Sequence, residues 1–67
     1  MTTSFWLPSD LWESQGIDRD AYLNATFGEG KWRPSDHRWG GLSNVYVDET
    51  MAAVAVILGG VRSNLVR

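Results

Sequence analysis

The 67-residue sequence contains no cysteine and only one histidine. Without cysteine, the chain can form neither a disulfide framework nor a typical structural zinc site. A chain this short buries a smaller fraction of its surface than a larger domain, so it needs another source of stability. We therefore expect one compact domain, residues 1–67, that depends on hydrophobic packing and holds neither a metal nor a cofactor.

A large charge imbalance and long apolar runs are also missing. Six Lys and Arg residues against eight Asp and Glu residues give a net charge of −2, which disfavours nucleic acid as a partner. The longest run without a polar side chain, residues 51–58, is far shorter than the roughly 20 residues that span a bilayer. The N-terminus lacks the basic start and apolar stretch of a signal peptide. These features predict a soluble protein without a membrane partner, cytoplasmic or, if a phage encodes it, part of a virion.

Tryptophan, by contrast, is abundant. Trp6, Trp12, Trp32 and Trp39 all fall within the first 39 residues. A tryptophan side chain can bury roughly 150–250 Å², more than most other residues. The four indole rings are therefore expected to close the core, to contact a partner, or both.

Two short helices are predicted in the N-terminal half. The first begins near Ser9, a residue type that caps helices, and ends at Gly16, where we expect a positive φ. The second extends from Asp18 to Phe27, with the Asp18 carboxylate as its cap and Gly28 as its end. Both helices are short enough to need tertiary packing for stability.

Residues 28–44 show neither a helical nor a strand period, and glycine and proline interrupt them repeatedly. We expect an ordered excursion held in place by Trp32 and Trp39, because long structureless loops are uncommon in small domains. A short hairpin is expected with residues 44–47 as its second strand.

The C-terminal segment is open to two interpretations. An acidic start at residues 48–50 and an alanine-rich run favour a helix over about residues 48–64. The alternative is a buried strand in residues 51–58, because residues 53–58 also alternate and contain β-branched side chains. The helix is the interpretation adopted here.

These segments together predict a small, α-rich α+β domain. Two short N-terminal helices and the C-terminal helix would pack around one core, with residues 28–44 laid across one side. The expected core residues are Trp12, Tyr22, Phe27, Val54, Ile57 and Leu58.

Two sets of residues are predicted to bind a partner. Cations alternate with aromatic rings in residues 31–39, and Trp and Arg are the residue types that dominate protein interfaces. The second set consists of alanines in the unbroken apolar segment 51–58, where small side chains would let the backbone of a neighbouring chain approach closely. The predicted partner-binding residues are Trp32, Arg33, Arg38 and Trp39 in the first set and Ala52, Ala53 and Ala55 in the second.

No set of residues predicts catalysis. His37 follows Asp36, but no serine lies in a nucleophile motif, so we expect no catalytic residue, no enzyme activity and no small-molecule substrate. The expected function is a non-catalytic protein–protein interaction or structural accessory subunit in a larger assembly. A virion or connector component of bacterial or phage origin is one example, with a protein partner or self-association.

The alternative function is a small nucleic-acid-binding protein. Residues 9–27 have the outline of a helix-turn-helix, and the Trp/Arg segment 31–39 could stack on single strands. Asp18 and Asp20 oppose the first possibility, because they lie where a recognition helix approaches phosphates.

Overall fold

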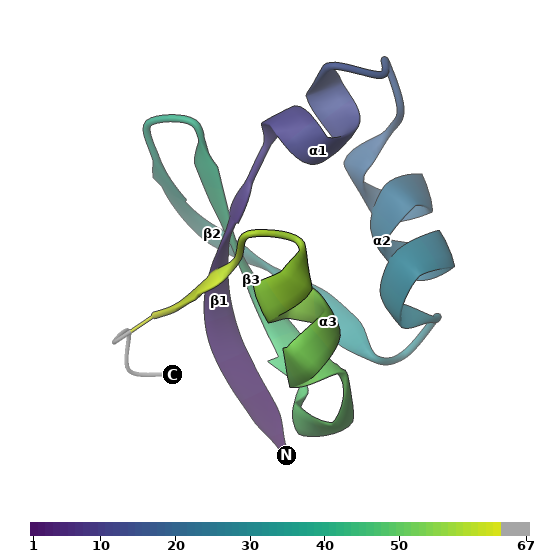
Figure 1. Cartoon of the computed structure of the whole chain (residues 1–67), viewed down its shortest axis with the longest axis vertical. Helices are drawn as coiled ribbons and strands as arrows, with labels where there is room; N and C mark the ends of the chain where they lie inside the picture. Colours follow the sequence, from purple (N-terminus) through teal and green to yellow (C-terminus); the bar gives the residue numbers. More distant parts are fainter. Residues whose placement is uncertain (64–67) are drawn as a thin grey trace.

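The centre of the protein is a four-stranded antiparallel sheet with the strand order β2-β3-β1-β4 (Figure 1). The computed structural model describes residues 1–63. The strands are β1 (Thr2–Pro8), β2 (Trp32–Trp39), β3 (Leu42–Asp48) and β4 (Val61–Arg62). The helical elements are α1 (Asp10–Glu13), α2 (Arg19–Phe27), the 3-10 turn η1 (Glu49–Met51) and α3 (Ala52–Ile57).

The expectation of an α-rich domain with a C-terminal helix is wrong. Strand accounts for 38% of the structure and helix for 35%. The difference arises mainly at β1 and β2, because neither segment shows the alternation of apolar and polar side chains from which a strand is recognised. In β1, Trp6 lies between the buried Phe5 and Leu7 and hides the alternation. In β2, most side chains are exposed.

The irregular excursion expected for residues 28–44 is largely a hairpin, because β2 and the first residues of β3 lie in this range and pair with each other. The turn between these strands contains Gly40, whose φ of 58° favours glycine. The predicted second strand, residues 44–47, lies inside the longer β3. The pairing is irregular between Pro34 and Arg38, where β2 bulges.

The helix predicted from Asp18 to Phe27 is present as α2. The Asp18 carboxylate accepts hydrogen bonds from the backbone N–H groups of Asp20 and Ala21 at 3.1 and 3.3 Å, and Gly28 ends the helix. The first helix is only the four residues of α1, and Gly16 follows it with the expected positive φ of 66°.

Ser9 precedes α1 but does not cap it. Its hydroxyl lies 2.7 Å from the Ser43 hydroxyl, and its backbone N–H donates to the Gly41 carbonyl at 2.8 Å. These bonds fix the start of α1 to the β2–β3 hairpin.

The helix predicted at residues 48–64 is wrong in its length. The Asp48 carboxylate accepts a hydrogen bond from the Thr50 backbone N–H at 2.9 Å and begins η1, and α3 then ends at Ile57. Gly59, with a φ of 91°, reverses the chain, which returns to the sheet as β4. The alternative of a strand in residues 51–58 is also wrong, because these residues are helical over most of their length.

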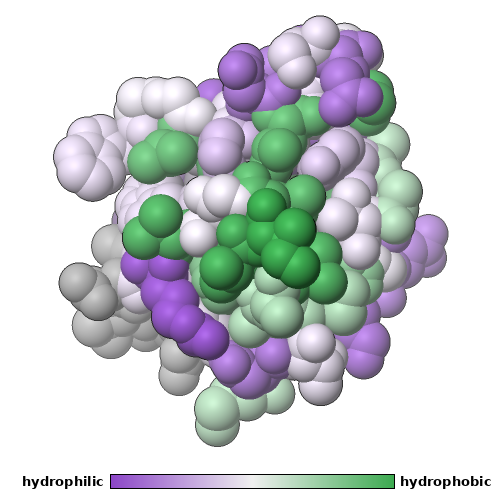
Figure 2. Space-filling model, in the orientation of Figure 1, coloured by the Kyte–Doolittle hydropathy of each residue, from purple (hydrophilic) through white to green (hydrophobic). Residues whose placement is uncertain are grey.

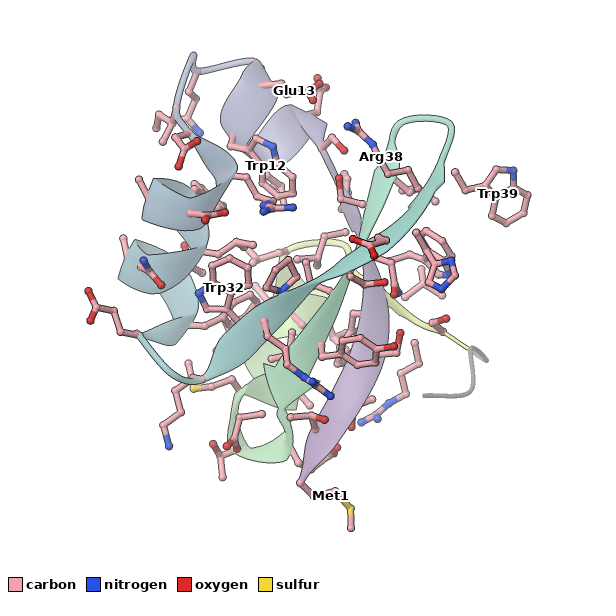
Figure 3. All side chains as sticks on the ribbon, turned by 180° about the vertical axis from the view of Figure 1, so that it is seen from behind. Met1, Trp12, Glu13, Trp32, Arg38 and Trp39 are labelled. Carbon is pink, nitrogen blue, oxygen red and sulfur yellow. The ribbon has the colours of Figure 1, made fainter. Side chains whose placement is uncertain are left out.

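All three helices pack on one face of the sheet. Register places Phe5, Leu7, Val45 and Val47 on this face, and one buried cluster joins them to side chains of α1, α2 and α3. The view from behind shows the sheet without a covering helix (Figure 3). The remaining members of the cluster are Trp12, Leu23, Phe27, Ala52 and Ala55.

The predicted core is correct in part. Trp12 and Phe27 are buried, and Tyr22, Val54 and Leu58 pack against the core while remaining partly exposed. Ile57 was expected in the core but is 82% exposed. Because α3 is only a short helix on the edge of the domain, it can bury only one side.

Candidate functional site

An apolar surface lies over α3 and β4. On the outer side of α3, Val56 and Ile57 are 55% and 82% exposed beside the exposed Ala53. Val61 on β4 is 63% exposed and shares the opposite sheet face with its register partner Trp6. We call Ala53, Val56 and Ile57, with Val61 at the β4 edge, the α3–β4 patch. Figure 2 shows the most hydrophobic side chains gathered over α3. Exposed apolar side chains that gather on one helix side often mark a contact with another molecule.

The patch follows from the composition of α3. Ala52 and Ala55 face the sheet and are buried, and residues on the opposite side of a short helix must then face solvent. A surface helix normally carries polar residues there, but every side chain of α3 is apolar. The exposed half of α3 is therefore as hydrophobic as the buried half.

One rim of the patch carries an ion pair. The guanidinium of Arg62 lies 3.3 Å from the Glu49 carboxylate and 5.3 Å from the centre of the Phe5 ring. The hydroxyl of Thr3 also donates to Glu49. These two partners, the Thr3 hydroxyl first and Arg62 second, hold the pKa of Glu49 below its usual value. The charges of Glu49 and Arg62 therefore cancel at this rim while both side chains are ionised.

The backbone of β4 is directed partly outward. The Ser63 N–H donates to the Ser4 carbonyl at 2.8 Å, so Ser63 points its backbone groups toward β1. The backbone groups of successive residues in a strand point to opposite sides. Arg62, next to Ser63, therefore points its N–H and C=O groups away from β1. β4 is one of the two outer strands of the sheet formed by residues 1–63. These outward groups lie next to the α3–β4 patch.

The face of the sheet opposite the helices carries aromatic side chains. Trp39 is 72% exposed, and its ring meets that of Trp6 edge-to-face with centroids 6.2 Å apart. The guanidinium of Arg33 lies 4.7 Å from the centre of the Tyr46 ring. Trp6 pairs with Val61 in register, so this aromatic surface adjoins the α3–β4 patch at the β4 edge.

A polar cleft of about 480 Å³ lies on the opposite side of the molecule from β4, between the α1–α2 region and β2. Arg38 and Glu13 approach each other at 3.8 Å, and Arg19 pairs with Asp20 at 2.9 Å. The ionic groups of this cleft thus largely pair with one another. Within residues 1–63, no group of three or more His, Asp or Glu side chains could hold a metal ion.

The structure separates the aromatic and basic residues predicted to bind a partner. Trp32 is half-buried against the core, and its indole N–H donates to the Asn24 side-chain oxygen at 2.8 Å. Arg38 lines the polar cleft on the helix side. Arg33 contacts Tyr46, and Trp39 lies at the far end of β2. Residues 31–39 therefore do not form a single surface.

The three alanines are likewise divided. Ala52 and Ala55 are buried within this chain, whereas Ala53 belongs to the α3–β4 patch. Val56 and Ile57, which share the exposed side of α3 with Ala53, were not among the predicted partner-binding residues. Helical spacing groups these three residues, but no sequence signal shows which side of an all-apolar helix faces solvent.

Comparison with known proteins identifies no relative of this chain. No family model matches the sequence, and no curated protein or solved structure matches it either. None of the helices in residues 1–63 has the length and hydrophobicity needed to cross a bilayer.

Proposed function

We propose that this chain is a non-catalytic protein-binding subunit whose contact surface is the α3–β4 patch. The observation that supports the proposal is the exposure of Ala53, Val56 and Ile57 on one side of α3. Covering apolar surface yields about 25 cal/mol per Å², so a partner chain that covers these side chains gains a favourable free energy. Their clustering makes this gain available to a single contact.

The nucleic-acid alternative has weaker support. A single-strand binding surface combines stacked aromatic rings with cations that follow the phosphates. On the sheet face opposite the helices, Arg33 accompanies Trp6, Trp39 and Tyr46, whereas Arg38 lies on the helix side. The α1–α2 segment has a four-residue first helix and carboxylates at the start of the second.

Site-specific photo-cross-linking tests the proposed function. A photoreactive phenylalanine analogue would replace Val56 in the full chain, and its matched control would replace Ile17, an exposed residue in the α1–α2 turn. After irradiation in the cells that produce the protein, we expect a discrete protein adduct from position 56 and none from position 17. Equal labelling at both positions, or no adduct from position 56, would refute the proposal.

A further inference from the structure

We propose that the polar cleft between the α1–α2 region and β2 binds a small hydroxylated amine, such as an amino sugar. The volume of the cleft, about 480 Å³, falls within the range of small-molecule sites, roughly 300–1,000 Å³. The cleft and the α3–β4 patch share no residue, so this inference goes beyond the proposed function and is tested independently of it.

An unused hydrogen-bond donor supplies the first argument. Trp12 lines the cleft and is only 4% exposed, and Figure 3 shows its ring between α1, α2 and the β2–β3 hairpin. Within residues 1–63, no group accepts a hydrogen bond from its indole N–H. The indole nitrogen is not enclosed, since the one enclosed and unpaired side-chain atom of the described chain is Asn44 Oδ1, and the cleft is the space that Trp12 borders. A buried indole N–H normally has a partner, so a ligand in the cleft should offer it an acceptor.

The charge of the lining supplies the second argument. Four carboxylates and two guanidinium groups border the cleft, and two ion pairs neutralise two of the carboxylates. Within the part of the chain that the structure describes, Asp18 and Asp36 form no ion pair. Asp18 caps α2 through one carboxylate oxygen, and Asp36 is exposed. This excess of negative charge favours a cationic ligand and disfavours phosphates and carboxylates.

The bulge in β2 supplies the third argument. The register with β3 is broken between Pro34 and Arg38, and the three residues between them, Ser35, Asp36 and His37, line the cleft. Bulges commonly redirect side chains beside functional sites. A hydroxyl, a carboxylate and an imidazole together offer both donors and acceptors, as the hydroxyl groups of a ligand require.

These three features together define the ligand. Asp18 and Asp36 favour a cation, but an ammonium group has only donors and cannot accept from the Trp12 N–H. A hydroxyl group on the same molecule accepts that hydrogen bond, while the ammonium group donates to the carboxylates. An amino sugar carries both groups on a ring of suitable size. We expect a dissociation constant of about 1–10 mM, because a ligand with so few atoms binds weakly.

NMR titration of the isotopically labelled full chain tests the proposal with four compounds that share a six-membered ring. Glucosamine carries hydroxyl groups and, at about pH 7, a mostly protonated amine. Glucose lacks the charge, cyclohexylamine lacks the hydroxyl groups, and glucuronate carries the opposite charge. Glucosamine should shift the indole N–H signal of Trp12, and the other three should bind at least about threefold more weakly. The indole signal of Trp39, on the sheet face opposite the helices, is the internal control and should not move.

A matched pair of substitutions locates the site. Asp36→Asn removes a carboxylate charge from the cleft with little change in shape and should weaken glucosamine binding at least about threefold. Glu29→Gln is the control, because Glu29 is an exposed carboxylate outside the cleft, and it should bind like the wild type. Both positions are exposed, and the NMR spectrum itself verifies that each variant is folded.

Four outcomes would overturn the proposal. An unmoved Trp12 signal up to about 50 mM glucosamine would refute binding in the cleft. A response to cyclohexylamine equal to that of glucosamine would show that hydroxyl groups are not recognised, and an equal response to glucose would show that the charge is not. Equal affinities of Asp36→Asn and Glu29→Gln would place the ligand elsewhere. None of these results changes the cross-linking expected at position 56, which tests the α3–β4 patch separately.

Discussion

The two outer edges of the sheet differ in how they meet solvent. At the β2 edge, Lys31 accepts a backbone hydrogen bond from Asp48 at 2.7 Å, so Lys31 and Arg33 point toward β3 while Trp32 and Pro34 point outward. Proline at position 34 removes one of the outward donors. A bulge and exposed charged side chains follow.

The β4 edge is blunted differently. Within residues 1–63 it carries neither a proline nor a bulge, but β4 is only two residues long and its outward residue is the charged Arg62. Short edge strands and charged side chains, like proline and bulges, hinder pairing with other chains. The longer β2 edge therefore carries a proline and a bulge, whereas β4 exposes the backbone groups of one charged residue.

The largest expected effect comes from detaching β4. A Cβ atom at Gly60 would lie 2.7 Å from both the Ala55 carbonyl oxygen and Leu7 Cδ2. Gly60→Ala should therefore lower the free energy of unfolding by about 2 kcal/mol. Urea denaturation followed by tryptophan fluorescence measures the change.

Gly41→Ala is the control for this substitution, because an added Cβ there has no atom within 4 Å. Its unfolding free energy should change by less than about 0.5 kcal/mol. Equal effects of the two substitutions would show that close packing beneath Gly60 does not hold β4 on the sheet.

The next prediction removes the protection of the β2 edge. Pro34→Val restores an outward N–H and introduces a residue that favours strands, so we expect new concentration-dependent association. Static light scattering over a range of protein concentrations compares the variant with the wild type. No increase in association would show that proline is not what protects β2.

A smaller effect is expected from the side chains along β2. Arg33→Ala removes the cation–π contact with Tyr46 and should lower the unfolding free energy by about 0.5–1 kcal/mol. Urea denaturation followed by tryptophan fluorescence measures the change. An unchanged unfolding free energy would show that the contact with Tyr46 does not stabilise the sheet.

The smallest effect concerns pH at the β4 end of the domain. Thr50 donates to Asp48 from both its hydroxyl and its backbone N–H and lowers the pKa of that carboxyl, and Thr3 and Arg62 lower the pKa of Glu49. A lowered folded-state pKa stabilises the fold above the unfolded-state values near 3.8 and 4.5, and this stabilisation is lost as the pH falls through the folded-state values. Thermal unfolding should thus shift to lower temperature in acid.

Glu49→Gln sharpens this prediction, because glutamine does not titrate. The acid shift of its unfolding temperature should be smaller than that of the wild type. An identical acid response of wild type and Glu49→Gln would place the responsible carboxylates elsewhere.

Local sequence determined those elements whose ends carry their own signals. Asp18 and Gly28 define α2 because one carboxylate satisfies the first N–H groups and one glycine accepts the positive φ at the end. Gly16 likewise has the positive φ expected from its place between two apolar segments. These features depend on neighbouring residues and could be read without the fold.

Tertiary structure decided the strands, the length of the C-terminal helix and the surface role of its residues. β1 becomes a strand because β3 and β4 satisfy its backbone groups, and its side-chain pattern is masked by Trp6. Which apolar residues of α3 are buried depends on the side that meets the sheet, because both sides of the helix are apolar. Exposure of Val56 and Ile57, and therefore the candidate site, arises only when packing assigns Ala52 and Ala55 to the core.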